Sequence, residues 1–468
     1  MARTAVQAIL LAAGASSRFK SETSKLLFTL CGQAMILFPV KILHALGIPT
    51  TLVIGYKKEQ IKRLLEEHGC DSLSFVEQAE QRGTGDAVAA TTATWHADHI
   101  FVMNGDMPLI QAELVANLIE QHIQSDAAVS FVTAHNTDPS TGAYGRIVHI
   151  NGIMSIVEAR DFTGNPQTDC CINAGIYIFR REFLKQYIDT LHTHANSREL
   201  YLTDLIEIAS RQHLRITTIT APFDQVRGVN TLQELWAAEQ IKRAEIIEHY
   251  MQQGVRFTYA QSTHVDVDVV IGAGTCIEAG VQLLSGTRIG KHVTIGSFSC
   301  IRNSVIGEHV TVQSHSIITD ATIGASARIG PFAHIHNNSS IGSESVIGNF
   351  VEVTTSSIAQ KTKIKHLSYI GNAHIGSNVN IGAGTIIANY NGVSKQTTII
   401  EDNASIGCNN SLVAPITIEQ YAMTGAGSVI TEDVPAHALA IARAQQVNKE
   451  GYATRLRASL SIAGVRML

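Results

Sequence analysis

The sequence predicts an α/β domain followed by a parallel β-helix. In the first half, short apolar segments alternate with amphipathic helical segments, and from about Ile271 to Ile430 an aliphatic residue recurs at every sixth position. An α-helix would need a period near 3.6 and a simple strand a period of 2. A six-residue period fits a β-helix, in which each flat side contributes one inward aliphatic residue and then turns on a small residue. Unrelated Ile-rich strands would not hold one phase over so long a stretch.

The repeat keeps its phase in blocks that are separated by one-residue slips. The first block ends at Ile301, the second begins at Ile306 and the third at Ile323. Between Ile387 and Ile400 the series is interrupted, so this segment must leave the coil as a loop. Irregular loops on a rigid scaffold are common places for functional sites.

Composition bounds the remaining possibilities. A chain of 468 residues is long enough for two or three domains. The net charge of −5 gives no electrostatic footprint for nucleic acid, and no apolar run approaches the roughly 20 residues of a membrane span. Seven scattered cysteines predict a reducing cytoplasm rather than a disulfide framework.

The first apolar segment, Val6 to Leu11, is typical of a buried parallel strand that ends at small residues. With Arg3 it also imitates a short secretory signal, although its apolar core is barely long enough for one. The loop from Leu11 to Arg18, with Lys25 beyond it, offers backbone N–H groups and basic side chains to phosphates. It lacks the Walker pattern, and an ordinary strand–helix turn is the alternative.

Further strands are predicted at Thr51 to Gly55 and at His99 to Met103, with an amphipathic helix at Lys58 to His68. This alternation implies a parallel sheet with helices on both faces and a ligand site at the carboxyl ends of its strands. The strand that ends at Met103 delivers Asp106 to that edge. A carboxylate there suits Mg²⁺, although a helix-capping role is the alternative.

A long helix is predicted from Thr231 to Gln253, where Thr231 and Glu234 form a capping box and Gly254 is a stop signal. It is a rigid spacer, a helix packed on the first domain, or both at once. The predicted boundaries are residues 1–230 for the first domain, 231–254 for the linker helix, 255–450 for the β-helix and 451–468 for a C-terminal tail without a clear pattern.

Five motifs follow one another in the first domain, each weak singly: Gln78 to Ala87, Thr141 to Arg146, Val157-Glu158, Ile172 to Gly175, and Gly228 to Asn230. In this order they resemble the sugar-nucleotide pyrophosphorylases. From about residue 5 to 452 the chain resembles, more closely, the bacterial bifunctional N-acetylglucosamine-1-phosphate uridyltransferases/glucosamine-1-phosphate N-acetyltransferases. The resemblance implies a Rossmann-like nucleotidyltransferase domain, a left-handed parallel β-helix, a homotrimer and small-molecule substrates.

For the first domain, the resemblance implies transfer of a uridyl group from UTP to N-acetylglucosamine-1-phosphate, with Mg²⁺. The nucleotide would be lined by Leu11, Ala12, Ala13 and Gly14, with positive charge from Arg18 and Lys25, and uracil would be read by Gln78, Gly83 and Thr84. Mg²⁺ would be held by Asp106 and Asn230, and the sugar by Gly145, Glu158 and Asn173. Asn104, before Gly105, replaces an aromatic residue that is usual in the family, which touches the sugar pocket.

For the β-helix, the resemblance implies acetylation of glucosamine-1-phosphate by acetyl-CoA. Acyl transfer to an amine needs a base, and His is suited to this near neutral pH. A single His among 20 is otherwise unremarkable. By resemblance His366 is the base; Tyr369, Asn380 and Lys395 bind the acceptor; Asn389 and Tyr390 stand near the reacting amine; and Ala383, Ala426 and Arg443 contact acetyl-CoA.

Three departures fall in this second site. His336 stands where the family has a phosphate-binding Arg, Thr354 where it has a phosphate-binding Lys, and Cys408 replaces a Ser near the acetyl group. Losing two cations could weaken acceptor binding on the order of a hundredfold. His334 and His336 would share one strand face, as metal ligands can, but the sequence shows no third ligand.

The sequence therefore predicts a bifunctional enzyme that makes UDP-N-acetylglucosamine. Two alternatives concern the β-helix, which could acetylate a different amino sugar or serve only as a trimerisation module. Acetyl-CoA binding separates these, because a pure scaffold should bind none.

Overall fold

The computed structural model describes residues 6–14, 17–135, 144–162, 171–194 and 197–462. Thr141 to Ala143, part of one predicted motif, lie outside these residues. Internal contacts divide the chain into two units, Met1–His249 with Val265–Val267, and Tyr250–His264 with Asp268–Leu468. Each unit is described by itself.

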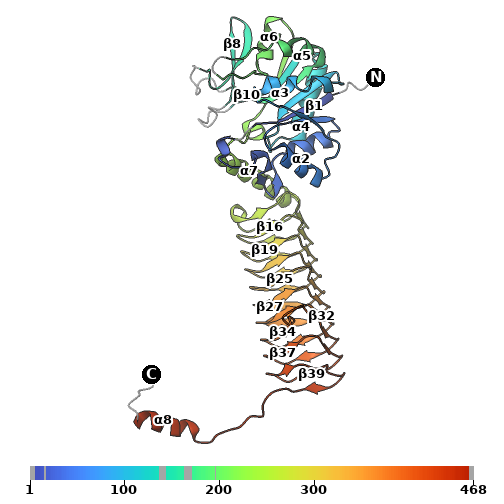
Figure 1. Ribbon diagram of the computed structural model, residues 1–468, viewed down its shortest axis with the longest axis vertical. Helices are drawn as coiled ribbons and strands as arrows, with labels where there is room; N and C mark the ends of the chain where they lie inside the picture. The colour runs from blue at the N-terminus through green and yellow to red at the C-terminus, as the bar shows by residue number, and fades with distance from the viewer. Residues whose placement is uncertain (1–5, 15–16, 136–143, 163–170, 195–196, 463–468) are drawn as a thin grey trace. The chain divides into compact units, whose positions relative to one another are not determined.

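The first unit is built on one mostly parallel sheet with the strand order β11-β7-β10-β6-β1-β4-β5 (Figure 1). Only β10 runs antiparallel to its neighbours β6 and β7 along this path. A hairpin of β8 (Arg146–Ile150) and β9 (Ile153–Val157) extends from β10. The strands of the path are β1 (Val6–Ala12), β4 (Thr50–Ile54), β5 (Ser74–Glu77), β6 (His99–Asn104), β7 (Val129–His135), β10 (Cys171–Arg180) and β11 (Ile216–Pro222).

Helices cover both faces of this sheet. Leu10 of β1 packs into a core with α1 (Leu37–Ala45), α2 (Lys58–Glu67) and α4 (Ala112–Gln124). Ile9, which points to the opposite face, packs into a core with three further helices. These are α3 (Thr84–Ala89), α5 (Arg181–Tyr187) and α6 (Asp204–Arg211). The predicted first strand is therefore a buried inner strand of the sheet, and the α/β prediction is confirmed.

The predicted long helix is α7 (Leu232–Gln252). Thr231 caps it, its Oγ1 accepting the N–H of Glu234 at 3.2 Å. The Glu234 carboxylate accepts the N–H of Asn230, at 2.7 Å, where a standard capping box would use the N–H of Thr231. Leu235 and Ala238 are buried in a core of the first unit, so at its start α7 is packed on that domain.

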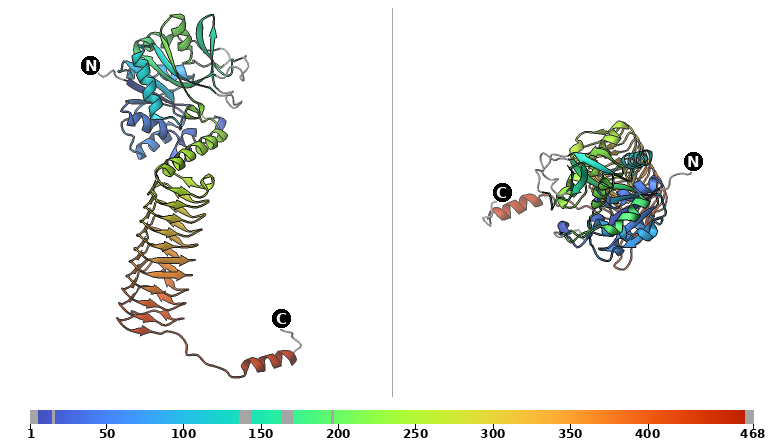
Figure 2. Two further views of the ribbon diagram at one scale, coloured as in Figure 1. Left: turned by 180° about the vertical axis from the view of Figure 1, so that it is seen from behind. Right: turned by 90° about the horizontal axis from the view of Figure 1, so that it is seen from above.

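The second unit is a β-helix of three parallel sheets, which stack short strands coil upon coil (Figure 2). Sheet I runs from β12 (Arg256–Phe257) to β41 (Leu439–Ala440), sheet II from β13 (His264–Val265) to β40 (Val429–Ile430), and sheet III from β14 (Val270–Ile271) to β38 (Ile416–Ile418). The inward aliphatic residues are almost fully buried, which confirms the six-residue pattern.

The phase slips of the sequence correspond to coils of unequal length. Ile271 pairs with Ile289, and Ile289 pairs in turn with Ile306, so the second of these coils is shorter than the first by a single residue. Ile375 pairs with Ile400, because residues 390–397 leave the coil as the predicted loop. Equivalent residues of successive coils therefore become neighbours in space, although a full coil of sequence separates them.

At the corner between sheets I and II, the coils turn at a residue whose backbone is in the left-handed region, and several of these residues are aromatic. Phe298, His315, Phe332 and Phe350 stack on one another with ring centroids 5.0–5.3 Å apart. The three phenylalanines are 47–61% exposed, so they form an apolar ridge that is interrupted by His315.

The last helix of the described residues is α8 (Tyr452–Ile462), which lies in the predicted C-terminal tail. Among the helices of the described residues, none combines the length and apolar character needed to cross a membrane.

Candidate active sites

A cavity of about 360 Å³ lies where β1 and β6 end, as expected for a sheet of this kind. The predicted nucleotide-binding residues meet there. Its walls include Leu11, Ala12, Ala13, Gly14, Lys25, Gln78, Gly83, Thr84, Asn104 and Asp106. Four residues that were not predicted as site residues also line it, namely Leu26, Gln81, Ala87 and Glu199. Gln81 donates a hydrogen bond to the carbonyl of Ala13.

A second cavity, of about 230 Å³, holds the predicted sugar-binding residues. It is lined by Arg18, Gly145, Glu158, Asn173 and Asn230, and shares Leu11, Thr84, Asn104 and Asp106 with the first cavity. Gly105 does not line either cavity; its N–H donates to the carbonyl of Leu11 and so ties the ends of β1 and β6 together. The two cavities therefore adjoin, and Asp106 lies in the wall of both.

The predicted metal ligands converge on one point. Lys25 Nζ contacts Asp106 Oδ2 at 2.5 Å and Asn230 Oδ1 at 2.7 Å, and Arg18 donates to the same Asn230 oxygen at 2.9 Å. Two oxygens that bind one ammonium group can equally hold one divalent cation, and carboxylate and amide oxygens are the donors that Mg²⁺ accepts. The donor set therefore fits Mg²⁺, with Lys25 as the cation that stands between the oxygens here.

Gln78 is held in one orientation inside the nucleotide cavity. Its side-chain amide donates to the carbonyl of Gly83 at 3.1 Å and to Asp86 Oδ2 at 2.8 Å. Both hydrogens of the amide group are then committed to the protein, which leaves Oε1 as the group for a ligand. Asp86 lay within a predicted motif but was not identified as a site residue, because only the fold shows its contact with Gln78.

Glu158 and Asn173 are fixed by residues from other elements. Thr203, which was not predicted, donates to Glu158 Oε1 at 2.8 Å, and Asn173 donates to the hydroxyl of Tyr177 at 2.6 Å. Burial raises the pKa of the Glu158 carboxyl, partly offset by the hydrogen bond from Thr203. The remaining oxygen of Glu158 can accept a hydrogen bond from a sugar hydroxyl.

Asn104 is accommodated by a glycine. Gly175 has a φ of +74°, and a Cβ atom at that position would lie 2.9 Å from Asn104 Nδ2. The register of β10 against β7 also shifts between Asn173 and Tyr177. This bulge brings the Asn173 side chain and Gly175 to the edge of the sugar cavity.

In the β-helix, the predicted base His366 ends β30 (Lys363–His366) and is exposed. Its Nδ1 lies 2.7 Å from Oδ1 of Asn349, which occupies the paired position on β27 (Val346–Asn349). Because an amide oxygen only accepts, Nδ1 must carry the proton and Nε2 is the basic nitrogen. Asn349, in the preceding coil, was not found from the sequence.

The predicted acceptor residues lie mainly on the outer face of sheet II. His336 belongs to β25 (His334–His336), Thr354 to β28 (Glu352–Thr354) and Tyr369 to β31 (Tyr369–Gly371), and these three strands stack in succession. Thr354 is buried and accepts a hydrogen bond from Asn337 at 2.9 Å. Asn380 lies elsewhere, exposed on sheet I in β33 (Asn380–Ile381).

The irregular loop carries Lys395, the last predicted acceptor residue, together with Asn389 and Tyr390, which were predicted to stand near the reacting amine. Asn389, at its base, is buried and donates to Asn372 Oδ1 at 2.7 Å, while Tyr390 pairs with Lys395 across the loop. Tyr390 and Lys395 are both exposed. A buried amide thus anchors a loop whose aromatic and cationic side chains face solvent.

The predicted acetyl-CoA residues stack along one corner of the coil. A Cβ on Gly382, next to Ala383, would meet the backbone of Cys408, and one on Gly407 would meet the backbone of Ala426. Ala383, Cys408 and Ala426 therefore occupy equivalent corners of successive coils. Arg443 donates to the carbonyl of Ala426 at 2.7 Å and is exposed, so its guanidinium lies at the end of this row.

On the same outer face of sheet II, His334 and His336 lie next to Glu352. Burial is the main cause that lowers the pKa of His334, and the neighbouring His336 lowers this pKa further. His336 Nε2 lies 3.1 Å from Glu352 Oε1. The expectation that no third potential metal ligand accompanies the two histidines is therefore wrong, because β28 brings Glu352 beside them from the next coil.

Comparison with known proteins gives consistent domain assignments. The MobA-like NTP transferase domain matches residues 8–198, the bacterial transferase hexapeptide (six repeats) matches 268–303, and the GMPPB C-terminal domain matches 317–450. These matches and the two cavities define a nucleotidyltransferase joined to a hexapeptide β-helix.

Relatives match nearly the whole chain. Proteins named Bifunctional protein GlmU are 40% identical in Exiguobacterium sibiricum, over 95% of this chain and 99% of the relative, and 38% identical in Clostridioides difficile, over 95% and 97%. The same-named protein of Koribacter versatilis is 38% identical over 96% of this chain and 97% of its own length. The chain belongs to the GlmU family of bifunctional proteins, which confirms the resemblance read from the sequence.

The buried carboxyl of Glu158 gives a prediction about stability. Its pKa in the folded chain is raised above the ordinary 4.5, so the unfolded chain ionises first and the folded state loses stability as pH rises through that interval. Glu158→Gln removes this loss and keeps an acceptor for Thr203. Denaturant midpoints should agree near pH 4 and favour the variant increasingly towards pH 7.

The control is Glu66→Gln, at an exposed helix position, which should show no such trend. A Glu158→Gln chain that is less stable than the parent at pH 7 would contradict the account.

Proposed function

We propose that the chain catalyses two steps in the synthesis of UDP-N-acetylglucosamine, uridyl transfer in its first unit and acetyl transfer in its β-helix. The observation that carries the first step is the meeting of a nucleotide cavity and a sugar cavity at Asp106, where Lys25 and Asn230 also converge. The tautomer of His366, set by Asn349, supports the second.

In uridyl transfer, a phosphate oxygen of N-acetylglucosamine-1-phosphate attacks the α-phosphorus of UTP, and pyrophosphate leaves with the bonding electrons. No protein nucleophile is needed, because positioning and charge neutralisation suffice. Lys25 and Arg18 supply fixed positive charge beside the phosphates. Mg²⁺, held by Asp106 and Asn230, would add further positive charge when bound.

Uracil is selected by the orientation of Gln78. Uracil presents an N–H at N3, whereas cytosine presents a bare acceptor nitrogen there. Since Gly83 and Asp86 hold the amide hydrogens of Gln78, its Oε1 is available to accept from uracil and would repel cytosine. Asp86 is thus a positioning residue for nucleotide choice.

Asp86→Ala should therefore allow the side-chain amide of Gln78 to rotate, so that its oxygen and nitrogen exchange places. The preference for UTP over CTP, measured as the ratio of kcat/KM values, should fall by about 10–100-fold, the value of one charge-assisted hydrogen bond. Glu80→Ala, an exposed change in the same segment, is the control and should keep the ratio. An unchanged ratio in Asp86→Ala would remove Asp86 from base selection.

In acetyl transfer, the amine of glucosamine-1-phosphate attacks the thioester carbonyl of acetyl-CoA, and the CoA thiolate leaves. Nε2 of His366 takes the proton that the amine loses. Tyr369, Asn380 and Lys395 would bind the acceptor, and Asn389 and Tyr390 would stand near its amine. Ala383, Cys408, Ala426 and Arg443 would bind acetyl-CoA along the corner on which three of them stack.

The acceptor pocket differs in charge from the pattern of its family. His336 and Thr354 replace two cations, and Thr354 is buried. An acceptor other than glucosamine-1-phosphate is the second candidate, and the loss of both cations favours it. A panel of amino sugars with and without a phosphate distinguishes the two.

We also propose that the chain acts as a homotrimer in the cytoplasm, on small molecules and without nucleic acid or membrane. The apolar ridge of Phe298, Phe332 and Phe350 is a surface that packing between β-helices would cover. Cys31, Cys70, Cys276, Cys300 and Cys408 are free thiols, as in a reducing compartment.

The two sites should fail independently. His366→Ala should lower acetyl transfer by about 10²–10⁴-fold, the usual contribution of a positioned base, and leave uridyl transfer unchanged. Asp106→Ala should abolish pyrophosphate release and leave acetyl transfer unchanged. Retained acetylation in the first variant would mean that His366 is not the base, and an active second variant would sink the metal assignment.

A further inference from the structure

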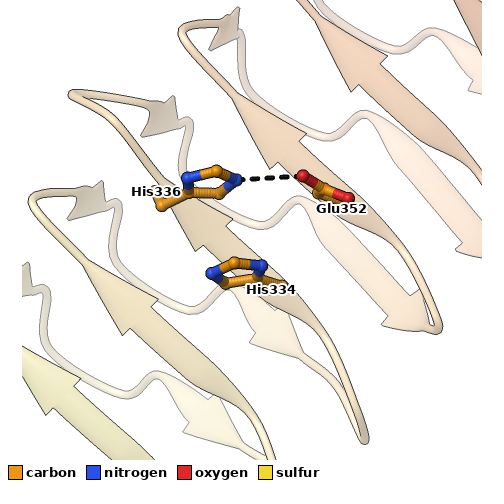
Figure 3. Close-up of side chains that lie close together, drawn as sticks. All are labelled: His334, His336 and Glu352. Atoms are coloured by element: carbon orange, nitrogen blue, oxygen red, sulfur yellow. Dashed lines mark hydrogen bonds and ion pairs between the residues drawn. The ribbon is translucent and has the colours of Figure 1, made fainter.

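We infer that His334, His336 and Glu352 form a binding site for a divalent transition-metal ion such as Zn²⁺, with open coordination positions on the outer face of sheet II (Figure 3). One nitrogen from each imidazole and one oxygen of the carboxylate all lie within 4.8 Å of one another. It is the only such group of three in the described part of the chain.

The geometry follows from the register of the coils. His334 and His336 flank the buried Ile335 on β25, so alternation points both imidazoles outward. β28 pairs in parallel with β25 and places Glu352 opposite His334. The carboxylate also reaches diagonally to His336 Nε2, at 3.1 Å. Two strands of a rigid scaffold therefore aim three donors at one place.

The distances suit a small cation. With bonds of about 2.0–2.1 Å, the ligand atoms of a tetrahedral Zn²⁺ lie about 3.3 Å apart. The pair formed by His336 and Glu352 already has this spacing, at 3.1 Å. His334, whose ring stacks on His336 with centroids 4.1 Å apart, has a ring nitrogen within 4.8 Å of both ligand atoms. Two imidazoles and one carboxylate favour Zn²⁺ or a similar ion over Mg²⁺, which prefers oxygen donors.

An ordinary hydrogen bond between His336 and Glu352 is the simplest alternative. It accounts for two of the three side chains but gives no role to His334, which lies parallel to His336 at van der Waals distance. A matched pair elsewhere is instructive. His292 and His309 also stack, with centroids 5.1 Å apart, but no acidic residue completes a group of three around them in the described residues.

The position of the site suggests its role, and this step rests on the proposed acetyl transfer. Tyr369, a proposed acceptor-binding residue, pairs with Glu352 in the next coil. An ion bound by three protein ligands keeps at least one position for an outside donor. We infer that it binds a phosphate oxygen of the sugar phosphate and so replaces the positive charge that His336 and Thr354 do not supply.

The test uses the full-length chain, stripped of metal with a chelator and titrated with Co²⁺, whose visible absorption reports nitrogen and oxygen coordination, and then with Zn²⁺ in competition. One ion per chain should bind with this signature. His334→Ala and Glu352→Gln should each weaken binding by more than about 100-fold, beyond the usual cost of losing an outer-shell partner. His309→Ala is the control and should bind as the parent does.

Since His334 is exposed and Glu352→Gln keeps its shape, folding of the β-helix should be preserved, and an unchanged far-UV circular dichroism spectrum and thermal midpoint check this. Co²⁺ binding that is absent, or equal in the parent and both variants, would overturn the site.

Acetyl transfer then separates the two proposals. Removing the metal should raise the KM for glucosamine-1-phosphate by about 10–100-fold with less effect on the KM for acetyl-CoA. If the ion binds as expected but acetylation is absent in every state, the proposed function fails and the metal site stands. If acetylation proceeds with the same KM after stripping, the ion has no part in acceptor binding.

Discussion

Parallel stacking of coils, at the roughly 4.7–4.9 Å spacing of neighbouring strands, is the constraint on which the second half of the molecule depends. Each inward aliphatic residue is buried beneath the equivalent residue of the next coil, which contributes about 1.5–3 kcal/mol per side chain. The same stacking makes outward residues neighbours when they occupy equivalent positions one coil apart. The contact of His366 with Asn349, and that of Glu352 with His334, are consequences of this register.

In the first unit, a different constraint makes neighbours of residues that are distant in sequence. Parallel strands end at one edge of a sheet, so the loop after β1 and the loop after β6 meet regardless of their distance in sequence. Lys25, Asp106 and Asn230 come from three separate segments. The ammonium nitrogen of Lys25 nevertheless lies within hydrogen-bonding distance of both side-chain oxygens. The cap of α7 contributes to this, because Glu234 accepts the N–H of Asn230 and fixes its backbone.

Sequence periodicity predicted the fold class, and the family resemblance named residues that line the two cavities of the first unit, because these residues stand in motifs at strand ends. They did not predict partners set by tertiary contacts. Asp86 orients Gln78 across a turn, and Asn349 orients His366 from the neighbouring coil. Glu352 was missed as a companion of the two histidines because one-residue differences in coil length obscure which residues face each other. The sequence also did not predict that Glu234 accepts the N–H of Asn230 in place of that of Thr231, because local backbone geometry decides this.

The central claim is that one chain carries two working sites, the second with an altered acceptor pocket. The most direct measurement is the release of free thiol from acetyl-CoA by the purified chain, with glucosamine-1-phosphate as the acceptor. Sustained release that depends on the acceptor is the predicted result. No release, in a preparation that performs uridyl transfer, would contradict the assignment of the β-helix as a glucosamine-1-phosphate acetyltransferase.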